Sequence, residues 1–157
     1  MTFNAEDFLS QSVEAPMATR MTVVPEGEYQ AFIGNEADDV AVMAIQGRKD
    51  PTKTYPRLTL LWKITGQPIN QELEREVITV RDQFLLDIDE NTGQLATSGD
   101  RNVSLGARRE AVGLNDGAFA LSQFRGAGPA LIRVTHRSDP RNPSIKYAEV
   151  SRVVKLG

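Results

Sequence analysis

The sequence predicts a mainly β domain, a small barrel of five strands with one helix between the third and fourth strands. Apolar and polar side chains alternate along several runs, most clearly along Arg57–Thr65, and a period of two is typical of a strand with one buried face. Turn signals separate the runs, as at Asp89–Gly93 and Asp139–Pro143. Between the third and fourth runs, Asn102–Val112 has a polar start and is followed by Gly113, which favours a helix.

Residues 1–24 are expected to form an acidic arm ahead of the domain, which spans residues 25–157. Asn4 followed by Glu6 and Asp7 is typical of a helix N-cap with acids in the first turn. We therefore expect a short helix that ends near Ser12, followed by an irregular stretch up to a turn at Pro25.

The remaining elements follow in chain order. An acidic bulge or turn at Glu36–Asp39 is expected to divide the first strand into two parts. Trp62, Phe32 and Phe84 fall on apolar strand faces and are expected in the core. The expected elements are strands at Glu28–Asn35 and Val40–Ile45, a loop at Gly47–Arg57, a strand at Arg57–Thr65, a helical turn at Asn70–Arg75, a strand at Glu76–Asp89, helices at Asn102–Val112 and Phe119–Phe124, and strands at Ala130–Arg137 and Ser144–Leu156.

This order of elements is that of an OB-fold, a five-stranded barrel with a helix between strands 3 and 4. OB-folds bind oligonucleotides on the face of strands 2 and 3 and on their first long loop. In this chain that loop corresponds to Gly47–Arg57. A β-sandwich and another small α+β barrel are the alternative architectures.

Composition limits the classes of protein to consider. With 157 residues, 40% of them hydrophobic and 25% charged, the chain has the size and composition of one globular domain. It has no cysteine, which excludes disulfides and thiolate sites and fits a reducing compartment. No apolar run approaches the length of a membrane span, and the acidic start is unlike a signal peptide. We therefore expect a cytoplasmic protein, in the host cell if it is viral, with no membrane contact.

Charge is distributed unevenly. The net charge is −3, yet residues 1–40 hold eight acids against Arg20 alone, whereas the rest of the chain holds 17 cations and 13 acids. Such asymmetry is typical of a polyanion-binding body with an acidic arm. The alternative is that the acids and bases pair with one another in the fold.

The loop at Gly47–Arg57 favours contact with a polyanion. It carries four cations, one aromatic and two prolines but no aliphatic residue, and Tyr55 could stack a base. Further cations fall on the wet faces of the expected strands, where the alternative is an ordinary solvated face. The candidate nucleic-acid-binding residues are Arg48, Lys49, Lys53, Tyr55, Arg57, Lys63, Arg81, Arg133, Arg137 and Lys146.

Catalytic patterns are missing from the sequence. His136 is the one histidine, whereas zinc sites usually need more than one His or Cys. No serine lies in a G-x-S-x-G turn and no P-loop occurs. Asp87–Gly93 departs from a calcium loop in the place of its glycine and its last acid. We expect no catalytic residue, no metal, no cofactor and no enzyme activity, and a surface or hairpin-end position for His136.

Six segments carry a family resemblance: VPEGEYQAFI (Val24–Ile33), KDPTKTYPRLTLLWKI (Lys49–Ile64), REVITVRDQFLLDI (Arg75–Ile88), NVSLGARREAVG (Asn102–Gly113), FRGAGPALIRVTHR (Phe124–Arg137) and YAEVSRVVKL (Tyr147–Leu156). Their layout resembles that of phage-encoded OB-fold single-stranded DNA-binding proteins. The resemblance implies a protein that coats exposed single strands during phage DNA replication and recombination. Many such proteins recruit partners through an acidic tail; here the acids lie in the N-terminal arm, so either the arm recruits partners or that model does not apply.

The expected partner is therefore single-stranded DNA. A homodimer and a protein partner bound through the acidic arm are additional partners to consider. The alternative functions are a phage virion structural or assembly protein, and an inhibitor of a host enzyme whose acidic arm mimics nucleic acid.

Overall fold

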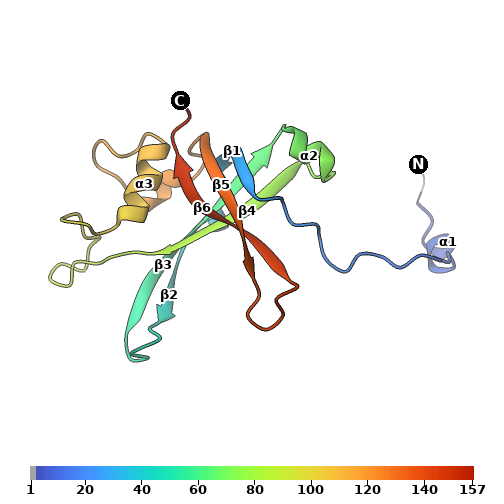
Figure 1. Ribbon diagram of the computed structural model, residues 1–157, viewed down its shortest axis with the longest axis horizontal. Helices are drawn as coiled ribbons and strands as arrows, with labels where there is room; N and C mark the ends of the chain where they lie inside the picture. The colour runs from blue at the N-terminus through green and yellow to red at the C-terminus, as the bar shows by residue number, and fades with distance from the viewer. Residues whose placement is uncertain (1–2) are drawn as a thin grey trace.

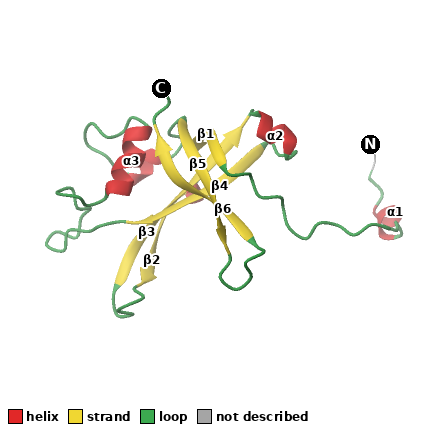
Figure 2. Ribbon diagram, in the orientation of Figure 1, coloured by secondary structure: helices red, strands yellow, loops and turns green. Residues whose placement is uncertain are grey.

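Five strands close into a barrel in the computed structural model, which describes residues 3–157, and a sixth strand extends the sheet (Figures 1 and 2). The strands are β1 (Gly27–Ile33), β2 (Val40–Gln46), β3 (Thr54–Thr65), β4 (Val77–Leu85), β5 (Ala130–Ser138) and β6 (Lys146–Val154). The helices are α1 (Ala5–Leu9), α2 (Pro68–Glu72) and α3 (Val103–Ala111), with 3-10 turns η1 (Ala37–Asp39) and η2 (Leu121–Phe124).

Strand pairing confirms the predicted OB-like barrel. The sheet order is β1-β5-β6-β4-β3-β2, and the end of β1 also pairs with β3, which closes the ring. All pairs are antiparallel except β4 with β6. The barrel strands in chain order are thus β1, β3, β4, β5 and β6, and α3 lies between the third and fourth of them, as predicted.

The alternation of apolar residues explains the barrel interior. Leu58, Leu60, Trp62 and Ile64 on β3 are fully buried, as a period of two requires for the inner face. On β6 a bulge opposite Arg133/Val134 shifts the register. The inward residues of β6, Val150 and Val153, are therefore three positions apart and still both buried.

A buried ion pair attaches α3 to the barrel. The Asp82 carboxylate, 1% exposed, accepts hydrogen bonds from Trp62 Nε1 at 3.0 Å and from Nε and an Nη of Arg108 at 3.0 and 2.9 Å. The Arg108 guanidinium also lies 5.0 Å from the centre of the Phe84 ring. A charge this deeply buried needs such partners, so the position of α3 on the barrel is specified by Asp82.

The acidic turn between β1 and β2 is held by one carboxylate. Asp39 is buried and accepts the Glu36 backbone N–H at 2.9 Å. A Cβ on Gly34 would lie 2.1 Å from an oxygen of that carboxylate, so the chain needs glycine there. β1 and β2 pair one after the other with the same side of β3. This confirms the predicted continuation of the first strand beyond the turn.

Several expected boundaries are wrong. α1 ends at Leu9 rather than near Ser12, the helical turn before β4 is α2 at Pro68–Glu72 rather than Asn70–Arg75, the expected helix at Phe119–Phe124 is the 3-10 turn η2, and β6 spans Lys146–Val154 rather than Ser144–Leu156.

The start of β3 and the end of β4 also differ from the prediction. β3 begins at Thr54, so the loop before it spans residues 47–53 and its last four predicted residues belong to a strand. Pro56 is tolerated there because its backbone faces the segment just past the end of β4. Its carbonyl accepts the Leu86 N–H, and the ladder requires no N–H from residue 56. β4 ends at Leu85 rather than Asp89, because the Asn102 side chain hydrogen-bonds the backbone of Asp87 and directs the chain into a loop.

The core prediction is confirmed for Trp62 and corrected for Phe32. Trp62 is fully buried and Phe84 is half-buried. Phe32 is 37% exposed, because its neighbours Ala31 and Ile33 occupy the inner face and the alternation turns Phe32 outward.

The N-terminal arm extends away from the barrel (Figure 1). Its short helix α1 is capped as predicted, since the Asn4 side chain accepts the N–H groups of Glu6 and Asp7 at 3.0 and 3.4 Å. Phe3, Phe8 and Leu9 are exposed. No helix within residues 3–157 has the length and apolar character to cross a membrane.

Candidate nucleic-acid interface

A groove lined by cations runs between the arm, the outer face of β4 and the β5–β6 hairpin. Its volume is about 1210 Å³. We call it the basic groove. The charged side chains along it are Arg20, Arg75, Arg81, Arg137, Lys146 and Asp139, five cations and one acid, and His136 and Tyr147 also line it.

The groove forms because β4 and β6 diverge from each other. These two strands are parallel neighbours and pair at one position, Arg81 with Glu149. The tip of the β5–β6 hairpin therefore separates from the start of β4, and Figure 1 shows it projecting from the barrel. Arg81 lies where the strands diverge, with its side chain exposed.

The cations of the groove differ in how they are held. Arg137 Nε lies 3.3 Å from a carboxylate oxygen of Glu149. Arg75 donates a hydrogen bond to the Thr22 carbonyl, which holds the arm beside the groove. Within residues 3–157, the Arg81 side chain lies in none of the ion pairs, so its charge is available to a ligand.

Tyr147 is an exposed aromatic ring whose orientation is fixed. Its hydroxyl donates to an Asp139 carboxylate oxygen at 3.0 Å, and the ring is 41% exposed. The backbone N–H of Arg141 and the Tyr147 hydroxyl hold the pKa of Asp139 below its usual value. Asp139 is thus ionised at neutral pH and keeps the tyrosine at the groove.

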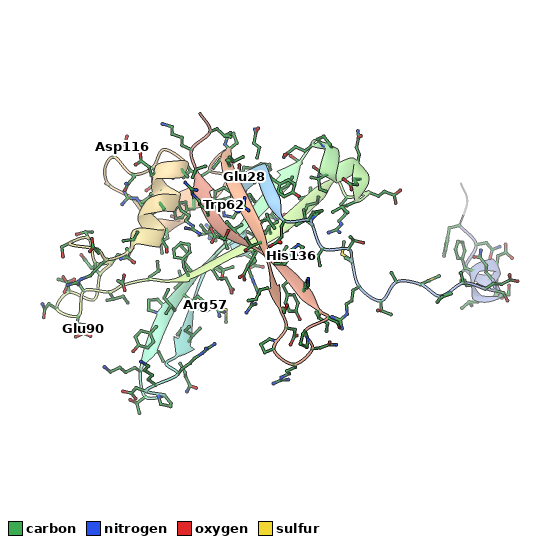
Figure 3. All side chains as sticks on the ribbon, in the orientation of Figure 1. Glu28, Arg57, Trp62, Glu90, Asp116 and His136 are labelled. Carbon is green, nitrogen blue, oxygen red and sulfur yellow. The ribbon has the colours of Figure 1, made fainter. Side chains whose placement is uncertain are left out.

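His136 fixes the arm where it enters the groove. Its Nε2 lies 2.7 Å from the Val24 carbonyl oxygen, and its backbone N–H donates to the Glu26 carboxylate at 2.9 Å. His136 is half-buried near the end of β5, beside the arm (Figure 3). The hairpin-end position was predicted, but the attachment of the arm to it was not.

The predicted basic loop forms the tip of the β2–β3 hairpin. Arg48, Lys49 and Lys53 are exposed there. The Tyr55 ring packs against the start of the loop, since a Cβ on Gly47 would lie 2.9 Å from Tyr55 Cε2. Tyr55 therefore braces the loop through one edge while remaining 40% exposed.

Acids of another loop lie beside this tip. Lys53 and Tyr55 border a second groove, which is also lined by Asp87, Asp89 and Glu90 on the segment after β4 and by Arg101. Two cations thus face three acids. The local field is less favourable to a polyanion than the composition of residues 47–57 implies.

Lys63 and Arg57 lie on the outer face of β3. Lys63 Nζ is 3.4 Å from an Asp39 carboxylate oxygen and donates to the Thr79 hydroxyl at 3.0 Å. Because Thr79 lines the basic groove, Lys63 borders it. Arg57 is half-buried, and its Nε has no hydrogen-bond partner among residues 3–157.

Arg133 lies outside the basic groove. Its guanidinium is 3.8 Å from a Glu28 carboxylate oxygen, in a separate depression shared with Arg152. Of the ten predicted residues, the groove brings together Arg81, Arg137 and Lys146. It adds four residues that sequence reasoning left out: Arg20, Arg75, His136 and Tyr147.

The acidic loop after β4 does not have the arrangement of a metal site. Asp87 Oδ2 accepts the Asn102 backbone N–H at 2.8 Å, and Asp89 Oδ1 accepts that of Asn91 at 2.9 Å. No group of three or more His, Asp or Glu side chains within residues 3–157 is placed to hold a metal ion.

Comparison with known proteins adds no relative: no protein family, curated protein or solved structure matches the chain. The resemblance to phage single-stranded DNA-binding proteins therefore stays a prediction from the sequence.

Proposed function

We propose that the protein binds single-stranded DNA without catalysing a reaction on it, as a coating protein in DNA replication or recombination. The observation that supports this most directly is the basic groove. Five cations converge there against one acid, and the groove lies against β4, the third barrel strand, on a face that OB-folds use for oligonucleotides.

Each part of the groove matches one part of a single strand. Guanidinium and ammonium groups bind phosphates regardless of sequence. An aromatic ring such as Tyr147 stacks an unpaired base, whereas the bases of a duplex are already stacked on each other. We therefore expect affinity for single strands to exceed affinity for duplex, with little dependence on base sequence.

Salt dependence follows from the number of cations. Contacts of all five groove cations with phosphates would give a slope of log K against log[salt] of about −3.5 for single strands. A slope near zero would show that phosphates are not the ligand.

The decisive experiment compares two arginines of β5. Arg137 and Arg133 are both exposed and each pairs with one glutamate, yet only Arg137 lines the basic groove. Fluorescence anisotropy with labelled oligo-dT at low salt should show a loss of about tenfold or more for Arg137→Glu, since a charge-assisted contact is worth about 1.5–3 kcal/mol. Arg133→Glu should change the affinity much less.

Parallel titrations with duplex DNA and oligo-rU define the ligand class. Binding of none of the three by the wild-type protein would overturn the proposal. Equal losses for Arg137→Glu and Arg133→Glu would leave general electrostatics as the source of binding and would exclude the groove.

A second candidate function, an assembly or interaction protein, is favoured by the arm. Phe3, Phe8 and Leu9 are exposed beside the acids Glu6 and Asp7, and such apolar groups usually mark a contact with another protein. A variant that lacks residues 1–18 separates the two functions. It should keep its affinity for oligo-dT if the arm serves a protein partner, and lose that affinity if the arm is part of the DNA site.

A further inference from the structure

The strand β2 presents an open edge. It pairs with β3 along its whole length, Val40 opposite Leu60 to Gln46 opposite Thr54. It is the last strand of the sheet order, and no other described strand pairs with it. In a strand with one neighbour, alternate N–H and C=O groups point away from that neighbour and remain unpaired.

This edge lacks the usual protection. Its sequence, VAVMAIQ, contains no charge and no proline, and charges, prolines and bulges are the features that normally keep edge strands from pairing. Val42 and Met43 are 50% and 57% exposed. The strand is uncharged and its middle, residues 42–44, is exposed, whereas Val40 at its start is buried. An uncharged and exposed edge of this kind is suited to receive another strand.

The charged residues at the two ends of β2 indicate which strand would pair with its open edge. Glu36 and Asp38 precede β2 and are exposed; Arg48 and Lys49 follow it and are exposed. A second β2 laid antiparallel along the first brings the acidic end of each copy to the basic end of the other. With the pair centred on Met43, the middle residue of the strand, Asp38 in the turn before β2 and Arg48 in the loop after it are equally far from the centre in sequence. The acidic end of one copy therefore lies near the basic end of the other.

We propose that two copies of this chain associate through antiparallel pairing of their β2 edges about a two-fold axis at Met43. The interface is isologous, so each contact occurs twice. β3 and β4 separate β2 from β6 in the sheet, so the basic groove of each copy stays open in the dimer. The dimer does not depend on nucleic acid, and the two proposals fail separately.

Cysteine cross-linking tests the axis directly, because the chain has no native cysteine. Opposed residues of an antiparallel pair have Cα atoms about 4.5–5.5 Å apart, within the range of a disulfide. Met43→Cys should therefore form a disulfide-linked dimer under mild oxidation at low protein concentration. Val103→Cys on α3, also at an exposed apolar position, is the matched control and should stay monomeric.

Sedimentation equilibrium of the wild-type protein should show a concentration-dependent dimer, and Met43→Lys should raise its dissociation constant at least about fivefold, because it places like charges opposite each other. Val103→Lys should leave the dissociation constant unchanged. Asp38→Lys and Arg48→Asp should each weaken the dimer, and the double variant should restore it, since the antiparallel arrangement exchanges the two ends.

A wild-type protein that is monomeric throughout the concentration range would overturn the proposal. So would Met43→Cys forming dimers no faster than Val103→Cys. Failure of the double variant to recover the dimer would overturn the antiparallel register.

Discussion

The two long hairpins of this protein, β2–β3 and β5–β6, are alike in their local chemistry. Both project from the barrel (Figure 1). Each tip holds an aspartate whose carboxylate accepts a backbone N–H two residues later, Asp50 from Thr52 at 3.0 Å and Asp139 from Arg141 at 2.8 Å. Each also carries an exposed tyrosine, Tyr55 at 40% and Tyr147 at 41%.

The hairpins differ in what lies beside them. The β5–β6 tip faces the start of β4 and the arm, which bring Arg75 and Arg20 toward its own cations. The β2–β3 tip has the higher local density of cations, but the neighbouring loop supplies Asp87, Asp89 and Glu90. A polyanion site therefore depends more on which segments converge than on how many cations one segment holds. One experiment tests the barrel that supports both hairpins and three test the difference between them, from the largest expected effect to the smallest.

The largest effect concerns the barrel that supports both hairpins. Asp82→Asn removes the charge that pairs with buried Arg108, and an uncompensated buried charge costs about 3–5 kcal/mol of the free energy of unfolding. Urea denaturation measures this loss. Glu149→Gln, which breaks the exposed pair with Arg137, is the control and should cost less than about 1 kcal/mol. Equal losses of unfolding free energy for the two variants would show that the pair of Asp82 with Arg108 does not stabilise the barrel.

The second experiment compares the cations of the two regions. Arg81→Glu with Lys146→Glu should lower affinity for oligo-dT about 100-fold or more, because each charge-assisted hydrogen bond to a phosphate is worth about 1.5–3 kcal/mol. Lys49→Glu with Lys53→Glu should lower it less than about tenfold, through the general field alone. Anisotropy titrations of both variants at one salt concentration decide between the hairpins. The reverse order would place the site at the β2–β3 tip.

The third experiment compares the two tyrosines. Tyr147→Ala should weaken binding of oligo-dT by about 1–3 kcal/mol, the value of one stacked base. Tyr147→Phe keeps the ring but removes the hydrogen bond that orients it, so its loss should be smaller. Tyr55→Ala should mainly loosen the loop that its ring braces at Gly47. A larger loss of affinity for Tyr55→Ala than for Tyr147→Ala would show that Tyr55 stacks on the ligand.

The smallest effect concerns pH. Hydrogen bonds from Thr52 lower the pKa of Asp50, and those from Arg141 and Tyr147 lower the pKa of Asp139. A lowered pKa in the folded protein means that each carboxylate contributes stability above its ordinary value of 3.8 and loses it as pH falls through the folded value. The stability of both hairpin tips should not depend on pH from about 5 to 8 and should fall in stronger acid.

Carboxyl NMR titration should show both groups ionising below their ordinary value. Asp139→Asn should shift the Tyr147 ring signals, and Asp50→Asn should leave them unchanged. A normal titration of Asp139 would indicate that its hydrogen bonds from the Arg141 N–H and the Tyr147 hydroxyl are not formed in solution.

Local sequence patterns were sufficient to predict most of the fold. The alternation on β3 located its buried face, and the cap at Asn4 located α1, because both depend on residues close together in the sequence. On β4, Asp82 follows Ile78 and Val80 on the inner face, where no charged residue was predicted. Its partner Arg108 was not predictable, since the two residues are joined only by the packing of α3 on the barrel.

The sequence by itself determined a five-stranded barrel with a helix after the third barrel strand, an acidic arm and a basic segment at residues 47–57. Only the tertiary structure decided which cations act together. The five cations come from the arm, from β4 and the segment just before it, and from the last hairpin: Arg20, Arg75, Arg81, Arg137 and Lys146. The convergence of these cations depends on the divergence of β4 from β6 and on the attachment of the arm at His136. Charge is a property of each residue, whereas the field at a site is a sum over neighbours that only the folded chain brings together.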